Sequence, residues 1–159
     1  MDKKVLIFLP FADQKNFRED EHPDFVITQH STSALLDYMG KVYNYQTIPR
    51  ENVKEFILKK VEEFGPDWII AEGNSATALL ELKLPNSILI NPKIKSEPLL
   101  NVSEEVRETS FGYFGMEHEK DYELFQSVFP NAGWYPHAEI HIVRLKSTLE
   151  AIINSDEDW

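Results

Sequence analysis

Apolar residues occur along the chain in two alternating patterns. Short segments rich in aliphatic, β-branched and aromatic residues, of the kind that form strands, occupy residues 5–9, 42–46, 67–71, 87–91, 111–115 and 133–135. Segments with apolar residues at helical spacing occupy 33–39, 49–64, 76–84, 122–129 and 145–153. This alternation predicts a predominantly parallel sheet of about five to six strands with helices on both faces.

The clearest predicted helix begins at Pro49 and ends before the Gly65-Pro66 pair. Its apolar stripe consists of Val53, Phe56, Ile57, Val61 and Phe64. The charged stretch 13–23 is predicted to be an exposed loop. Residues 93–109 have weak periodicity and are expected to include loop, and the tail 155–159 is expected to be frayed.

Length and composition fit one α/β domain spanning residues 1–159. With 27 acidic residues against 16 basic ones, the net charge of −11 disfavours nucleic acid and anionic membrane surfaces as partners. The absence of cysteine excludes disulfides, cysteine zinc sites and thiol nucleophiles. No segment reaches the roughly 18 apolar residues of a transmembrane helix, and no signal peptide is visible, so we expect a cytoplasmic protein.

The sharpest chemical signal lies where the predicted strand 67–71 turns into the next helix. There, Gly73 stands two residues before Ser75, as in the G-x-S-x-G turn that presents a nucleophilic serine at the end of a buried strand. Thr77 occupies the position of the second glycine, so the match is partial. The same residues also fit an ordinary turn in which Ser75 caps a helix beginning at Ala76.

A serine nucleophile needs a histidine base and an acid that orients it. In the chain order serine, acid, histidine, Ser75 is followed by Glu117 and then by His141, each just past a predicted strand. Glu119 and Asp121 are alternative acids, and His118 and His137 are further histidines. The three carboxylates equally fit the acidic first turn of the helix that they precede.

Several stretches resemble the α/β-hydrolase superfamily, and within it the small bacterial esterases that carry almost no lid. The resembling stretches are 5–11 (first strand and oxyanion loop), 72–77 (nucleophile elbow), 84–94 with its Asn-Pro pair, 97–100, 114–117 (triad acid) and 138–141 (triad histidine). This resemblance implies a reduced three-layer hydrolase fold and a serine hydrolase acting on a small ester or thioester.

The resemblance assigns Ser75 as nucleophile, His141 as base and Glu117 as orienting acid. It implies that the N–H groups of Phe11 and Ala76 form the oxyanion hole. Pro10, Thr77, Met116 and the Ala138-Glu139 pair depart from the family pattern. These departures favour the alternative, a catalytically degenerate relative that serves as a binding or interaction module.

Two other interpretations remain open from the residues. His137, Glu139 and His141 alternate along the chain and share one face of an extended segment, as ligands of a divalent ion would. A flavodoxin-like doubly wound domain would need a glycine-containing phosphate loop, and residues 10–13 contain no glycine. The favoured interpretation expects no cofactor and no metal. It names a small-molecule ester or acyl substrate as partner and leaves a homodimer open.

Overall fold

The computed structural model describes residues 4–9, 40–43, 51–94, 101–140 and 145–153. Within these residues six strands form one sheet in the order β2-β1-β3-β4-β5-β6, and every neighbouring pair is parallel. The strands are β1 (Val5–Phe8), β2 (Gly40–Tyr43), β3 (Trp68–Glu72), β4 (Ser87–Ile90), β5 (Ser110–Phe114) and β6 (Asn131–Trp134). The predicted α/β class and parallel sheet are confirmed.

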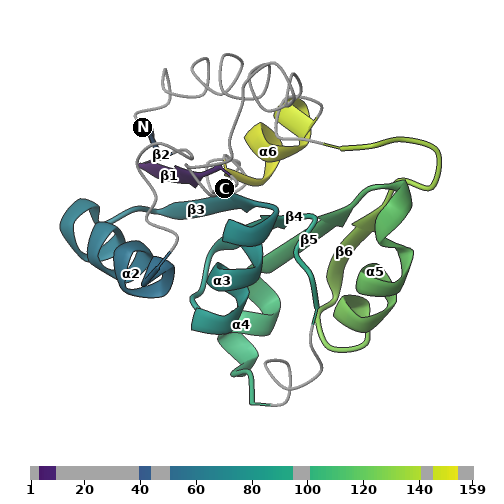
Figure 1. The fold of residues 1–159 in the computed structure, drawn as a ribbon, viewed down its shortest axis with the longest axis horizontal. Coiled ribbons are helices and arrows are strands. Elements are labelled where there is room, and N and C mark those ends of the chain that lie inside the picture. Colours follow the sequence, from purple (N-terminus) through teal and green to yellow (C-terminus); the bar gives the residue numbers. More distant parts are fainter. Residues whose placement is uncertain (1–3, 10–39, 44–50, 95–100, 141–144, 154–159) are drawn as a thin grey trace.

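The helices cover both faces of this sheet (Figure 1). They are α2 (Val53–Phe64), α3 (Asn74–Leu82), α4 (Glu104–Thr109), α5 (Glu119–Gln126) and α6 (Lys146–Ile153), with a 3₁₀ turn η4 (Met116–His118) before α5. From β2 onward each crossover steps in the same direction across the sheet. Because parallel crossovers are right-handed, α2, α3, α4 and α5 lie on one face, and α6 lies on the other.

The core has two layers, one on each side of the sheet. Leu6 and Phe8 of β1 pack with the layer under α2 to α5, whereas Val5 and Ile7 pack with the layer under α6. Every residue of β1, β3 and β4 is buried. Strands covered on both faces must be apolar at successive positions, which explains the continuous apolar runs.

Several helices and strands begin or end at other residues than the sequence predicts. The helix expected over 49–64 is described from Val53, and it ends at Gly65, whose φ of 61° and N–H bond to Val61 O close the last turn. The helix expected over 76–84 begins at Asn74, and the strand expected over 42–46 is Gly40–Tyr43. The helix expected over 122–129 is α5 (Glu119–Gln126). It begins and ends three residues earlier than predicted, and Ser127 is its C-cap.

Helix α4 falls inside the segment whose weak periodicity indicated loop. Its N-cap is Ser103, whose hydroxyl accepts a hydrogen bond from Val106 N at 3.2 Å, and two glutamates occupy its first turn. Val106 is its buried residue. A helix this short shows no repeating apolar stripe, so the capping serine followed by acidic residues is its sequence signal.

Some predicted features lie outside the described residues: the loop 13–23, the helix 33–39 and the tail 155–159. The order of the first five strands, 2-1-3-4-5, is that of flavodoxin-like doubly wound sheets. Fold alone does not assign a function, because one fold hosts many. Among the helices that the structure describes, none combines the length and apolar character needed to cross a bilayer.

Candidate functional site at the carboxyl edge of the sheet

The strand order reverses at β1, because the chain continues to β2 on one side and to β3 on the other. In open α/β sheets, ligands bind beyond the carboxyl ends of the strands at such a reversal. Leu9 follows β1 and Gly73 follows β3 at this point. The predicted nucleophile Ser75 therefore lies where the topology favours a site.

Ser75 itself is fully buried, with 0% of its surface exposed. Its hydroxyl donates a hydrogen bond of 2.7 Å to the carbonyl oxygen of Leu9. No other described residue forms a hydrogen bond with this hydroxyl. A nucleophilic serine instead donates to a histidine and exposes its oxygen to the substrate. The hydroxyl thus joins the end of β1 to the start of α3.

The sharp bend between β3 and α3 falls at Gly73, two residues before Ser75. Gly73 has φ of 64° and ψ of −131°, a region that is essentially restricted to glycine. It is the N-cap of α3, and no side chain caps this helix. The interpretation of Ser75 as the cap of a helix starting at Ala76 is therefore wrong.

The other predicted catalytic residues are not brought together within the described part of the chain. Ala76 lies buried in the first turn of α3, where backbone N–H groups have no partner inside the helix. Glu117 is exposed on η4. Phe11 and His141 lie outside the described residues, as does Pro10.

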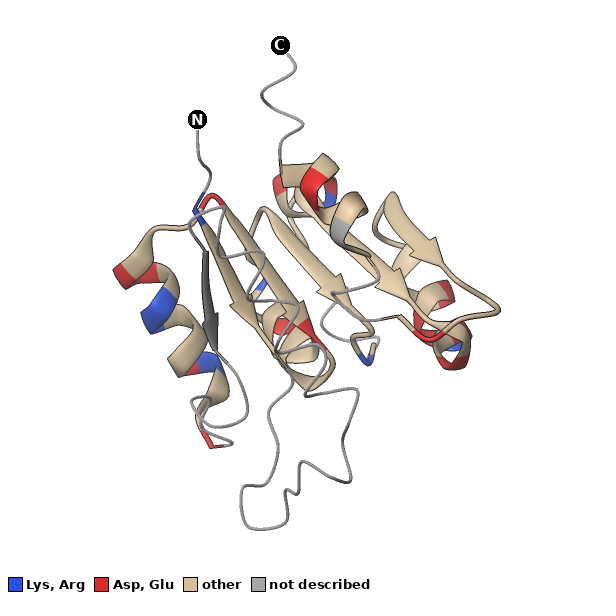
Figure 2. Cartoon of the chain, turned by 90° about the horizontal axis from the view of Figure 1, so that it is seen from above, with Lys and Arg blue, Asp and Glu red and all other residues tan. Residues whose placement is uncertain are grey.

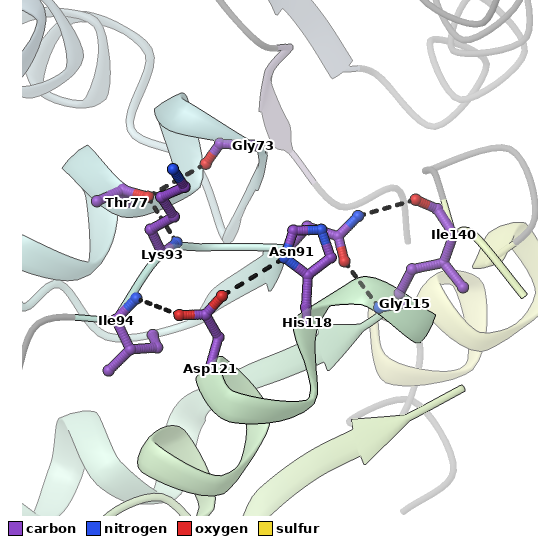
Figure 3. A network of polar contacts seen from close by, with 9 residues as sticks. All are labelled: Gly73, Thr77, Asn91, Lys93, Ile94, Gly115, His118, Asp121 and Ile140. Atoms are coloured by element: carbon purple, nitrogen blue, oxygen red, sulfur yellow. Dashed lines mark hydrogen bonds and ion pairs between the residues drawn. The ribbon is translucent and has the colours of Figure 1, made fainter. Parts of the chain in front are cut away.

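Thr77, which replaces the expected second glycine of the elbow, has a structural role. Its hydroxyl accepts a hydrogen bond of 2.8 Å from Lys93 N and donates one of 3.4 Å to Gly73 O (Figure 3). The side chain thereby connects α3 to the segment that follows β4. Glycine could not make either bond.

Asn91 connects the ends of two neighbouring strands with the segment after β6. Its φ of 54° turns the chain at the end of β4, a conformation that asparagine tolerates well. The side-chain Oδ1 accepts a hydrogen bond of 2.8 Å from Gly115 N, and Nδ2 donates one of 3.0 Å to Ile140 O (Figure 3). These two hydrogen bonds of the Asn91 side chain, which we call the Asn91 bracket, connect the end of β4 to Gly115 and Ile140.

A cavity of about 200 Å³ opens beside this bracket, and we call it the edge cavity. Its lining residues are Asn91, Gly115, Met116, Glu117, His118, Glu139 and Ile140. Met116 is one of the two large apolar side chains that are clearly exposed in the described residues, at 43%. Figure 2 shows acidic residues on η4 and α5, the elements beside this cavity.

His118 and Asp121 form an organised pair next to the edge cavity. His118 Nδ1 lies 3.5 Å from Asp121 Oδ2, and Asp121 Oδ1 accepts a hydrogen bond of 3.0 Å from Ile94 N (Figure 3). Asp121 also occupies the first turn of α5 together with Glu119, as the helix interpretation of these acids expected. Sequence reasoning missed this pair, although its i, i+3 spacing at a helix start was the signal.

The metal interpretation has no support within the described residues. No group of three histidine, aspartate or glutamate side chains in this part of the chain is arranged to hold an ion. His141, the third member of the predicted set, lies outside it.

Among the described titratable groups, Tyr113, which is not a lining residue of the cavity, has a clearly perturbed pKa. Burial raises the pKa of Tyr113 above its usual 10.0, and the neighbouring Tyr135 raises it further. Tyr113 lies on β5, opposite Gly133 of β6.

Comparisons with protein-family models, with curated proteins and with solved structures find no match to this chain.

Proposed function

We propose that the protein binds a small molecule in the edge cavity and that Ser75 serves structure rather than nucleophilic catalysis. The observation that carries the binding site is the edge cavity, and the observation against catalysis by Ser75 is the buried hydrogen bond from its Oγ to Leu9 O. A hydroxyl held this way is not exposed to a substrate, and no residue in the described part of the chain hydrogen-bonds to it as the base that acyl transfer requires. The protein would then be a binding module on a doubly wound parallel α/β scaffold.

The position and size of the edge cavity support the binding site. It lies at the carboxyl ends of β4 and β5, on the edge of the sheet where ligands bind but not at the reversal of strand order at β1. The two hydrogen bonds of the Asn91 side chain connect Gly115 and Ile140, which both line it. Its volume of about 200 Å³ is below the range typical of drug-sized ligands, so the ligand is expected to be compact.

A serine hydrolase is the second candidate, favoured by the place of Ser75 at the strand-order reversal and in the first turn of α3. In that case Ser75 would attack the carbonyl of a small ester or thioester, and His141, oriented by Glu117, would take the serine proton and return it to the alcohol or thiol that leaves. The N–H groups of Phe11 and Ala76 would hold the oxyanion. For this reaction the Ser75 hydroxyl would first have to break its hydrogen bond to Leu9 O.

A fluorophosphonate probe, which reacts with activated serines, separates the two candidates. We expect the intact mass of the folded protein to remain unchanged after incubation with the probe. Ser75→Ala and His141→Ala variants are treated in parallel. Labelling that is lost in both folded variants would contradict the binding-module proposal and establish the hydrolase.

A further inference from the structure

We infer that the edge cavity accepts a compact organic cation, such as a primary alkylammonium. This inference rests on the proposed function, because it assigns the ligand class of the same site. It follows from which hydrogen-bonding groups of the cavity are already occupied and which remain available.

The N–H donors at the cavity are largely engaged inside the protein. The engaged donors are Gly115 N (to Asn91 Oδ1), Asn91 Nδ2 (to Ile140 O), Met116 N (to Ala138 O) and His118 N (to Gly115 O). A ligand that needs several donors, such as a carboxylate or phosphate, would find few of them there.

The acceptors, in contrast, remain available. Neither Glu117 nor Glu139 forms an ion pair with another residue of the described chain, and both line the edge cavity. His118 lines the same cavity, and its Nδ1 lies 3.5 Å from Asp121 Oδ2 (Figure 3).

Apolar surface completes the match to an alkylammonium. Met116 and Ile140 line the same cavity, so an aliphatic chain has contacts besides those of the cationic head. None of the lining residues is lysine or arginine, so no fixed positive charge opposes a cation. A volume of about 200 Å³ equals roughly seven water molecules, which limits the ligand to about ten non-hydrogen atoms.

The test compares three probes of similar size and different charge on the ¹⁵N-labelled full chain near neutral pH: n-butylammonium, 1-butanol and butyrate. We expect butylammonium to shift the amide signals of Gly115, Met116 and Ile140 saturably, with a dissociation constant on the order of 1 mM for so small a ligand. We expect butanol and butyrate to leave these signals in place.

Substitutions then test the roles of the carboxylates. Glu117→Gln and Glu139→Gln keep the shape of each side chain and remove its charge, so each is expected to weaken butylammonium binding about two- to fivefold, as for exposed ion pairs. Glu123→Gln on α5 is the matched control. It removes one exposed carboxylate from a neighbouring position outside the cavity lining, and we expect less than about a twofold change.

The outcomes distinguish this inference from the proposed function. Saturable shifts with butanol or butyrate, and none with butylammonium, would overturn the ligand class and leave the binding site standing. An absence of shifts with all three probes, or equal weakening by all three substitutions, would overturn the inference. A different result, the labelling of Ser75 by the fluorophosphonate probe, would contradict the proposed function itself.

Discussion

The hydroxyl of Ser75 donates a hydrogen bond of 2.7 Å to the carbonyl oxygen of Leu9, across 66 positions of the chain. Leu9 follows β1, and Ser75 lies in the first turn of the helix after β3. Because β1 and β3 are neighbours in the sheet, the bond joins the two strand ends at the reversal of strand order. This structural hydrogen bond explains the serine at position 75 without a catalytic role.

Ser75→Ala is expected to destabilise the fold and to leave ligand binding in the edge cavity intact. The substitution leaves the buried Leu9 carbonyl without its side-chain donor, which costs about 1–3 kcal/mol of unfolding free energy. Urea denaturation measures this cost, and titration with butylammonium measures the binding.

Ser127→Ala supplies the control for this experiment. The Ser127 hydroxyl also donates to a carbonyl, that of Leu124 at 2.6 Å, but in an exposed place. Water can replace that bond, so we expect a change within about 0.5 kcal/mol. Equal effects of the two substitutions would contradict the structural role of Ser75.

Asn91→Asp is expected to disrupt the bracket while retaining a residue that tolerates the left-handed turn. The carboxylate can still accept from Gly115 N, but it has no N–H for Ile140 O and repels that carbonyl. We expect a loss of about 1–3 kcal/mol and large shifts of the Ile140 amide signal. Unchanged Ile140 signals would show that the bracket does not hold this segment.

The fold class could be predicted because its physical cause is local in the sequence. Strands such as β1 and β3 are covered on both faces, and this coverage requires consecutive apolar residues that are visible without a structure. The boundaries were less predictable. Strand β2, for example, begins at Gly40, two residues before the predicted start at residue 42.

The candidate site was harder to predict from the sequence than the fold class, because its contacts join residues that are far apart in the chain. Asn91 bonds to residues 24 and 49 positions away, and nothing local to the Asn-Pro pair indicates these partners. Ser75 has the local pattern of a nucleophile, yet its burial depends on β1 and β3 being neighbours. Of the acids after β5 that the sequence singled out, Glu117 lines the edge cavity, and nothing in the sequence indicated that this cavity exists.

Gly112→Ala is expected to destabilise the contact between β5 and α5. An added Cβ would lie 2.6 Å from Cε1 of Phe125, whose ring is fully buried and stacks on Phe129. Such overpacking costs about 1–3 kcal/mol, measured by urea denaturation. In the Phe125→Leu background the smaller side chain leaves room, so the same substitution should cost less. Additive effects of the two substitutions would contradict a direct clash.

The raised pKa of Tyr113 predicts a loss of stability at alkaline pH. Burial, followed by the effect of Tyr135, holds this pKa above 10.0 in the folded state. At pH values above 10.0 the unfolded chain therefore releases the phenol proton first and binds fewer protons than the folded chain, so unfolding free energy falls as pH rises. The contribution of Tyr113 is fully present below pH 10.0 and declines as the pH rises through the folded-state pKa.

Urea denaturation of the native chain and of Tyr113→Phe across this alkaline range isolates the contribution, because all other groups titrate in both proteins. The difference in unfolding free energy between them is expected to be constant below pH 10.0. Above it, the native chain should lose stability faster, by at most about 1.4 kcal/mol per pH unit, the limit for one proton. Tyr135→Phe removes the weaker of the two causes that raise the pKa of Tyr113. The folded-state pKa should then lie closer to 10.0, and stability should be lost over a narrower range of pH. A difference that stays constant at all pH values would mean that Tyr113 ionises equally easily in both states.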